Sequence, residues 1–427
     1  MAENKEKQKA IFTKKDSKKR TVLMPNMFPE FSQIMKVAIE RNGYKAGIFP
    51  FANEEAVELG KRYVHNDICF PAQLNVGEVL HGLKNGNYKR DEIAVALGKR
   101  CNACRALQYF TLVRKSLDES GYSDIPIVTN GSDIYETHPG FRLGFYWDII
   151  ALQGMLIWES LNEMRQKTLP YEKNQGETEK VFKHYMDKGM DALMTNFRRA
   201  KKVLKEAVPA FNKIEIDRSN PKPKVVIIGE ILVNYNSVAN YGLIEYLRGN
   251  DMETILPPIS DFFSQEMVNY KYAHEKKFSE IPLKDWVMQQ IIEGVVNFNR
   301  KPIDKIMKSF RFYEYRPTVY EISKNASEVF DISFNSGEGW LMPGEIIAMI
   351  KKGIKSFIIV QPFGCLPNHI SGRGLIKAIK EKYNDIQILS LDYDPDISIG
   401  NIENRLQMLI MTARELEKKN LRSSRRV

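Results

Sequence analysis

The chain alternates continuous apolar segments with segments of helical spacing, and this alternation most constrains its fold. Strands that are apolar on both faces are typical of a parallel sheet covered by helices on both sides. The pattern therefore predicts an α/β fold with an open, doubly wound sheet in each of two similar halves. The expected strands are residues 21–25, 45–50, 92–97, 124–129, 224–229, 253–256, 356–360 and 386–391.

A chain of 427 residues usually forms two domains, and the pattern divides this one accordingly. Pro71 suits the first turn of an expected helix at 71–83, because its missing N–H would be unpaired there anyway. A further helix is expected at 236–248. The predicted organisation is a disordered basic tail at 1–20, a first α/β domain at 21–141, a helical connector at 142–221, a second α/β domain at 222–418 with a helical insertion near 261–325, and a basic tail at 419–427.

The net charge of +10 comes almost entirely from the two ends of the chain. Residues 1–20 carry eight Lys/Arg against three Asp/Glu, and residues 414–427 carry six against two. The remaining body is close to neutral, so a nucleic-acid groove is not expected. There is no apolar run of about 20 residues and no secretory signal, which predicts a cytoplasmic protein without a membrane segment. No phosphate-binding GxxxxGK[ST] loop is present.

The chain has four cysteines, which lie in three segments. Cys69, the pair Cys101 and Cys104, and Cys365 each sit in what looks like a turn before a helix, and the last two segments directly follow expected strands. Ligands of open α/β sheets bind at the carboxyl ends of strands, so two domains facing each other across a cleft are expected to enclose a cofactor there. In a reducing compartment these cysteines are not expected to form disulfides, and they suit metal binding because thiolates are soft ligands.

Three interpretations of the cysteines remain open from the residues alone. An iron–sulfur cluster between the two domains uses all three segments. A four-thiolate zinc site normally has two CxxC knuckles in a small domain, and a redox CxxC or ordinary thiols leave Cys69 and Cys365 without a role. The helix starts and the nearby Arg100 and Arg105 favour anionic sulfur. His369 is either a donor near the site or a surface histidine, and the turn at 337–340 (GEGW) is most simply a plain turn.

Five short motifs occur in order along the chain: NDICFPA at 66–72, CRA at 104–106, GEILV at 229–233, GEGWL at 337–341 and PFGCLPNH at 362–369. Together they resemble the 2-hydroxyacyl-CoA dehydratase superfamily, and are most similar to the C-terminal region of the large activase-related proteins associated with those dehydratases. The similarity extends from about residue 20 to 415, which is nearly the whole chain.

The resemblance implies two Rossmann-like domains with a cluster at their interface. Cys69, Cys104 and Cys365 match the family's ligand positions and would hold a [4Fe–4S] cluster with one open iron; related members hold double-cubane clusters instead. Cys101 departs from the family's pattern, in which a small or polar residue is usual. It is therefore either a fourth ligand or a bystander.

The resemblance also implies a partner: a separate ATPase activator of the actin-like fold, which carries its own cluster and works in an anaerobic cell. A dimer or hetero-oligomer is expected. The first hypothesis is a low-potential iron–sulfur protein in ATPase-driven electron transfer or reduction. The second is a true dehydratase subunit, a radical lyase that binds an acyl-CoA thioester at the open iron. The third is a zinc-stabilised, non-redox binding protein. No catalytic residue is assigned.

Overall fold

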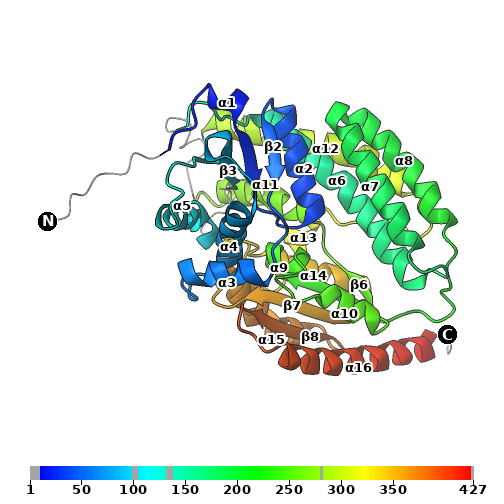
Figure 1. Cartoon of the computed structure of the whole chain (residues 1–427). Helices are drawn as coiled ribbons and strands as arrows, with labels where there is room; N and C mark the ends of the chain where they lie inside the picture. Colours follow the sequence, from blue (N-terminus) through cyan, green and yellow to red (C-terminus); the bar gives the residue numbers. More distant parts are fainter. Residues whose placement is uncertain (1–9, 99–103, 131–137, 279–281, 425–427) are drawn as a thin grey trace. The chain divides into compact units, whose positions relative to one another are not determined.

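The structure is a computed structural model that describes residues 10–98, 104–130, 138–278 and 282–424. The chain divides into two compact units, residues 1–151 (unit 1) and residues 152–427 (unit 2). Each unit contains a four-stranded parallel sheet together with helices (Figure 1). The predicted α/β class, with one open sheet in each half, is confirmed.

The sheet of unit 1 has the strand order β2-β1-β3-β4, and every pairing is parallel. From β1 the chain first adds β2 on one side and then adds β3 and β4 on the other side. The order of strand addition therefore reverses between β1 and β3, and this pair is the topological switch point. The strands are β1 (Thr21–Met24), β2 (Lys45–Ile48), β3 (Ile93–Leu97) and β4 (Ile127–Thr129), and the helices are α1 (Asp16–Lys19), α2 (Pro29–Arg41), α3 (Glu54–Tyr63), α4 (Phe70–Asn85) and α5 (Tyr109–Glu119), followed by the start of α6 (Phe145–Thr168).

Helices α3 and α4 pack unusually closely, and this contact fixes the start of α4. A Cβ atom on Gly77 would lie 1.8 Å from the carbonyl oxygen of Ala56, so only glycine fits between the two helices. The other side of α4 packs into the core of unit 1 through Val76, Val79 and neighbouring apolar side chains. The turn before α4 is therefore held between a close helix contact and the core.

The sheet of unit 2 repeats the strand order of unit 1, as β6-β5-β7-β8, again with only parallel pairs. Its strands are β5 (Lys224–Gly229), β6 (Glu253–Ile255), β7 (Ser356–Pro362) and β8 (Gln387–Tyr393). Gly229 ends β5 with φ +153°, and a Cβ atom there would lie 1.8 Å from the carbonyl oxygen of Val360 on β7. The two strands at the switch point therefore approach each other at a position that requires glycine.

Helices make up most of unit 2. Helices α7 and α8 lie side by side, and α16 runs along β8 (Figure 1). No described helix is both long enough and apolar enough to cross a membrane. The helices are α7 (Glu177–Thr195), α8 (Phe197–Lys213), α9 (Ile231–Tyr235), α10 (Leu243–Gly249), α11 (Ile259–Glu275), α12 (Leu283–Met307), α13 (Val319–Ala326), α14 (Leu341–Lys351), α15 (Ile376–Lys382) and α16 (Ile399–Ser424), besides the main part of α6.

The helix expected at 236–248 is wrong in its first half. The side-chain oxygen of Asn236 accepts hydrogen bonds from the backbone N–H groups of Val238 and Ala239, both at 3.0 Å. Tyr241 then takes a positive φ of 52°, and α10 begins only at Leu243. Short polar side chains that bond to the nearby backbone compete with helix formation, which explains the break.

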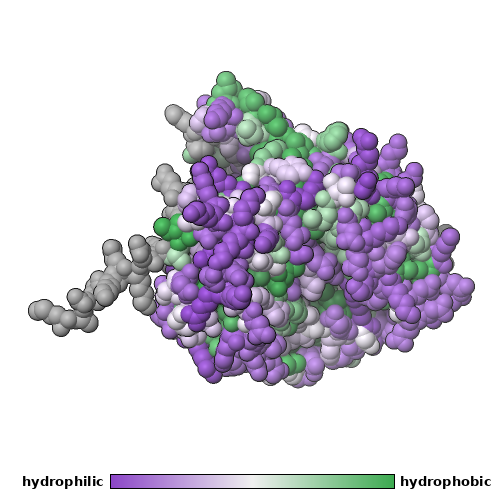
Figure 2. All heavy atoms as spheres, turned by 45° about the horizontal axis from the view of Figure 1, so that its top comes forward, coloured by the Kyte–Doolittle hydropathy of each residue, from purple (hydrophilic) through white to green (hydrophobic). Residues whose placement is uncertain are grey.

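Helix α12 exposes a row of large apolar side chains. Figure 2 shows a mainly hydrophilic surface with a hydrophobic area at the top of its view. The exposed apolar residues of α12 are Leu283, Trp286, Val287, Met288, Ile291 and Phe298. Contiguous apolar surface of this kind is typical of an interaction face, and the expected oligomer stays a prediction.

Candidate cysteine site

The three described cysteines all lie at the start of a helical segment. Cys69 is the residue before α4, and Cys104 is the residue before the short 3₁₀ helix η2 (Arg105–Gln108) that leads into α5. Cys365 follows β7 and precedes the helical segment that leads into α15. In each case the cysteine carbonyl oxygen accepts a backbone N–H from three or four residues later, at 3.0 to 3.3 Å. The first N–H groups of a helix favour negative charge, so these positions suit anionic sulfur.

In unit 1, two side chains hold the turn that contains Cys69. The hydroxyl of Tyr109, at the start of α5, lies 3.3 Å from the sulfur of Cys69. Arg105 directly follows Cys104. Its guanidinium donates to the carbonyl oxygen of Ile68 at 2.9 Å and also to that of Asp67. Arg105 therefore connects two turns that are far apart in the sequence. The sequence predicts only that its positive charge favours an anionic sulfur, and the structure adds this positioning role.

In unit 2, Asn368 connects Cys365 to a buried acid. The side-chain N–H₂ of Asn368 donates to the sulfur of Cys365 at 3.2 Å and to Oε2 of Glu338 at 3.0 Å. Asn368 is fully buried, and its side-chain oxygen has no hydrogen-bond partner in the described part of the chain. Both N–H groups of this buried amide are used, one for the sulfur and one for the carboxylate. The amide therefore fixes the position of the sulfur relative to Glu338.

Glu338 belongs to a pair of carboxyl groups at the carboxyl end of β5. Glu230 directly follows this strand, and its Oε2 accepts the backbone N–H of Val233 at 2.8 Å. Oε1 of Glu338 accepts the N–H of Ile231 at 3.2 Å. Burial, together with the charge of Glu338, raises the pKa of Glu230 to about 8, and burial also raises the pKa of Glu338. The pair is therefore expected to retain a proton at neutral pH.

Unit 1 has a corresponding buried carboxyl group. Glu78 lies on α4 and is 3% exposed, and its Oε1 accepts the backbone N–H of Asn26, two residues after β1, at 2.9 Å. Burial raises the pKa of Glu78 to about 8. Strands β1 and β5 occupy the same place in the two sheets, so each unit has a carboxyl of raised pKa at the carboxyl end of this strand.

His369 belongs to a separate polar group at the ends of β7 and β8. Its Nδ1 lies 3.4 Å from the side-chain nitrogen of Gln361, and its Nε2 lies 3.9 Å from a carboxylate oxygen of Asp392. Arg373 completes the group with an ion pair of 3.0 Å to Asp392. The imidazole is partly exposed, which favours the interpretation of His369 as a surface histidine.

The predicted ligands are distributed over both units. Cys69 and Cys104 belong to unit 1 and Cys365 to unit 2, while Cys101 lies outside the described residues. Within the described ranges there is no group of three or more His, Cys, Asp and Glu side chains that could hold a metal ion. A cluster shared by both units therefore stays a prediction.

Sequence reasoning missed the polar network behind Cys365. Glu230, Glu338 and Asn368 each lie within a quoted motif, yet nothing in their spacing reveals that they meet, since more than 100 residues separate the first from the second. The Gly-rich segment does form a turn, with positive φ at Gly337 and Gly339, as expected. No protein-family model matches the chain, and no curated protein matches it.

Proposed function

We propose that this chain is an iron–sulfur protein of the 2-hydroxyacyl-CoA dehydratase type. Cys69, Cys104 and Cys365 hold a low-potential [4Fe–4S] cluster across a cleft between the two domains. The protein accepts electrons from a separate ATPase activator and uses them in a reduction or transfers them further. The single observation that carries the proposal is the common placement of the three cysteines, each directly before a helical segment.

The surroundings of the cysteines fit such a group. Iron–sulfur clusters are held by cysteine thiolates, and their potentials depend on hydrogen bonds to sulfur and on solvent exposure. The residues Cys69 and Cys365 are both buried, and the sulfur of each has a side-chain hydrogen-bonding partner. Cys104 and Cys365 follow β3 and β7, which occupy the same place in the two sheets. In each of the two domains, a cysteine therefore follows the carboxyl end of the corresponding strand.

The protein's own residues position and polarise the sulfurs. Asn368 gives the sulfur of Cys365 an N–H donor, which stabilises negative charge on that sulfur. Tyr109 offers its hydroxyl to the sulfur of Cys69, and Arg105 fixes the turn that contains this cysteine. When bound, the cluster supplies one-electron transfer. Neighbours that orient ligands in this way commonly tune affinity and potential.

Iron content of single cysteine variants, purified without oxygen, tests the assignment. Replacing Cys69, Cys104 or Cys365 by Ala removes a thiolate ligand, and we expect most of the iron and sulfide to be lost from each variant. Cys101→Ala serves as the matched control, because only the other three cysteines match the family's ligand positions. Complete loss of iron in Cys101→Ala would overturn the three-ligand assignment, and full retention in the other three would overturn the proposed site.

The same preparations distinguish the alternatives. One zinc per chain without sulfide would favour the zinc-stabilised binding protein. Binding of an acyl-CoA thioester that perturbs the electron paramagnetic resonance (EPR) spectrum of the cluster would favour a true dehydratase subunit. The chain has no phosphate-binding loop, so the purified protein is expected to hydrolyse no ATP and to need a separate ATPase for reduction.

A further inference from the structure

A cavity of about 110 Å³ lies in unit 2, beside the carboxyl end of β6. One wall is formed by residues 158–167 of α6, and another by residues 345–352 of α14. Residues 253–258 and 314–317 close the remaining sides. All of these residues belong to unit 2, so one compact unit builds the whole cavity. Open α/β sheets commonly bind ligands at the carboxyl ends of their strands.

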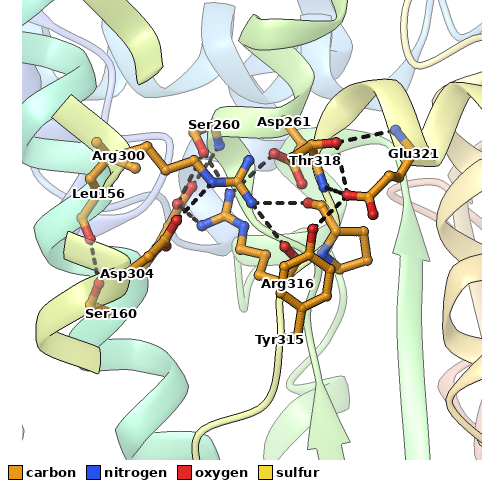
Figure 3. Close-up of polar contacts among 12 residues, drawn as sticks. Leu156, Ser160, Ser260, Asp261, Arg300, Asp304, Tyr315, Arg316, Thr318 and Glu321 are labelled. Carbon is orange, nitrogen blue, oxygen red and sulfur yellow. Dashed lines mark hydrogen bonds and ion pairs between the residues drawn. The ribbon is translucent and has the colours of Figure 1, made fainter. Parts of the chain in front are cut away.

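The buried side of the cavity carries more acids than bases. Arg316 contacts two buried carboxylates. Its Nη1 lies 2.7 Å from a carboxylate oxygen of Glu159. Its Nη2 lies 3.1 Å from a carboxylate oxygen of Asp261 (Figure 3). Its Nη2 also donates to the hydroxyl of Ser260 at 2.8 Å. One guanidinium thus faces two carboxylates, and this part of the wall keeps an excess negative charge.

A second, partly buried base on the walls, Lys167, is also paired with acids. The ammonium of Lys167 lies 2.8 Å from a carboxylate oxygen of Glu163 and 3.6 Å from one of Glu314. Its positive charge is therefore already offset by two carboxylates. Arg316 and Lys167 each already face two carboxylates, so neither offsets the charge of another acid on the walls.

Glu345 is another acid on the wall of the cavity. It lies on α14, lines the cavity, and is only 7% exposed. Its carboxyl group has no hydrogen-bond partner within the described ranges. A buried carboxyl without a partner costs free energy, and a ligand that supplies N–H donors would relieve that cost.

We propose that this cavity binds a small organic cation, an alkylammonium or guanidinium ion, which donates N–H groups to Glu345. Trp158, Ile255 and Ile322 give the cavity apolar walls that suit a short hydrocarbon chain, and an aromatic wall also suits a cation. A cavity of about 150 Å³ accommodates benzene, so this one suits about four or five non-hydrogen atoms. A metal ion fits less well, because the described residues form no group of three potential ligands.

Binding of the cation should be coupled to loss of a proton from Glu345. Burial raises the pKa of Glu345 well above its ordinary value; Asp261 and Glu338 raise it further, whereas Arg316 lowers it. Glu345 therefore holds its proton more tightly than an ordinary carboxyl group and is expected to release it when the cation binds. Affinity should then rise with pH until the ligand loses its own proton. The other charged or titratable groups around the cavity are Glu159, Glu163, Lys167, Tyr235, Glu253, Glu314 and Lys352.

Ligand-observed NMR on the full-length protein tests the proposal, with n-propylammonium as the probe at millimolar concentration. The neutral analogue 1-propanol, the anion propionate and calcium ion serve as comparators. We expect n-propylammonium to bind at pH 8 more tightly than at pH 6, and more tightly than any comparator. Glu345→Gln should weaken binding at least tenfold, while Glu403→Gln, at an exposed position of α16, should leave it unchanged.

A second variant covers the case in which Glu345→Gln does not fold. Ala348→Leu adds side-chain volume to the wall formed by α14 and should also weaken binding of the ammonium ion without changing any charge. The proposal is overturned when n-propylammonium does not bind, when 1-propanol, propionate or calcium binds as tightly, or when a folded Glu345→Gln variant retains the wild-type affinity. A pH-independent affinity would overturn the assignment of Glu345 as the ionising partner.

Discussion

Replacing Asn368 by Leu removes the one amide that bonds both the sulfur of Cys365 and the carboxylate of Glu338. Leucine has the same branched arrangement of side-chain heavy atoms but no N–H donor, so the change removes the two hydrogen bonds at 3.2 Å and 3.0 Å. A typical hydrogen bond contributes about 0.5–1.5 kcal/mol net. If that amount stabilises the reduced more than the oxidised cluster, it corresponds to roughly 20–60 mV for one electron, because 59 mV is a tenfold change. We therefore expect the reduction potential to fall by this amount.

The potential is measured by an anaerobic redox titration followed by EPR, with Asn401→Leu, at an exposed position of α16, as the control. The folded protein should also become less stable by about 1–3 kcal/mol, because the buried oxygen of Glu338 loses its donor. Destabilisation with an unchanged potential would show that Asn368 only packs the core. A higher potential would refute the reasoning, since loss of an N–H donor cannot stabilise the reduced state. Absence of iron in the wild type would instead refute the proposed cluster.

Three further predictions follow from buried polar groups. Glu78 has its pKa raised to about 8, so its proton is held more tightly in the folded state, and stability should fall by roughly 3–5 kcal/mol as pH rises from 4.5 to 8. Chemical denaturation at several pH values measures this dependence of the unfolding free energy on pH. Glu78→Gln should remove much of it, whereas Glu54→Gln, at an exposed position, should not. The same pH dependence in the wild type and both variants would show that Glu78 does not titrate in this range. Arg316→Met leaves its two buried carboxylates unpaired and should cost about 3–5 kcal/mol of unfolding free energy, with a loss below about 1 kcal/mol contradicting the geometry. Tyr109→Phe removes the hydroxyl beside the sulfur of Cys69 and should lower the cluster potential by tens of mV, as for Asn368; no change would show that the hydroxyl does not donate to this sulfur.

The fold was largely predictable because its strands are buried on both faces. Residues 93–97 and 225–229 are continuous apolar runs, and the structure has β3 and β5 there, each in the interior of its own sheet. Pro71 marked the start of α4, which begins one residue earlier. The break in the helix expected after residue 235 was not predictable from periodicity, because it depends on side-chain hydrogen bonds of Asn236.

The candidate site was predictable in its cysteines and not in their neighbours. The placement of Cys69, Cys104 and Cys365 before helices follows from local sequence. The contact of Asn368 with Glu338 depends on how β7 and the Gly-rich turn pack, and no local pattern reports such a contact. For the same reason, the cavity between α6 and α14 was not anticipated, since its walls come from four segments spread over almost 200 residues.

The central claim is that this chain holds an iron–sulfur cluster, and its iron and acid-labile sulfide content tests this claim most directly. The full-length protein, purified without oxygen, is predicted to be brown, with about four iron and four sulfide per chain and an EPR signal on reduction. Exposure to air should bleach it. A colourless anaerobic preparation without sulfide, with or without one zinc per chain, would contradict the account.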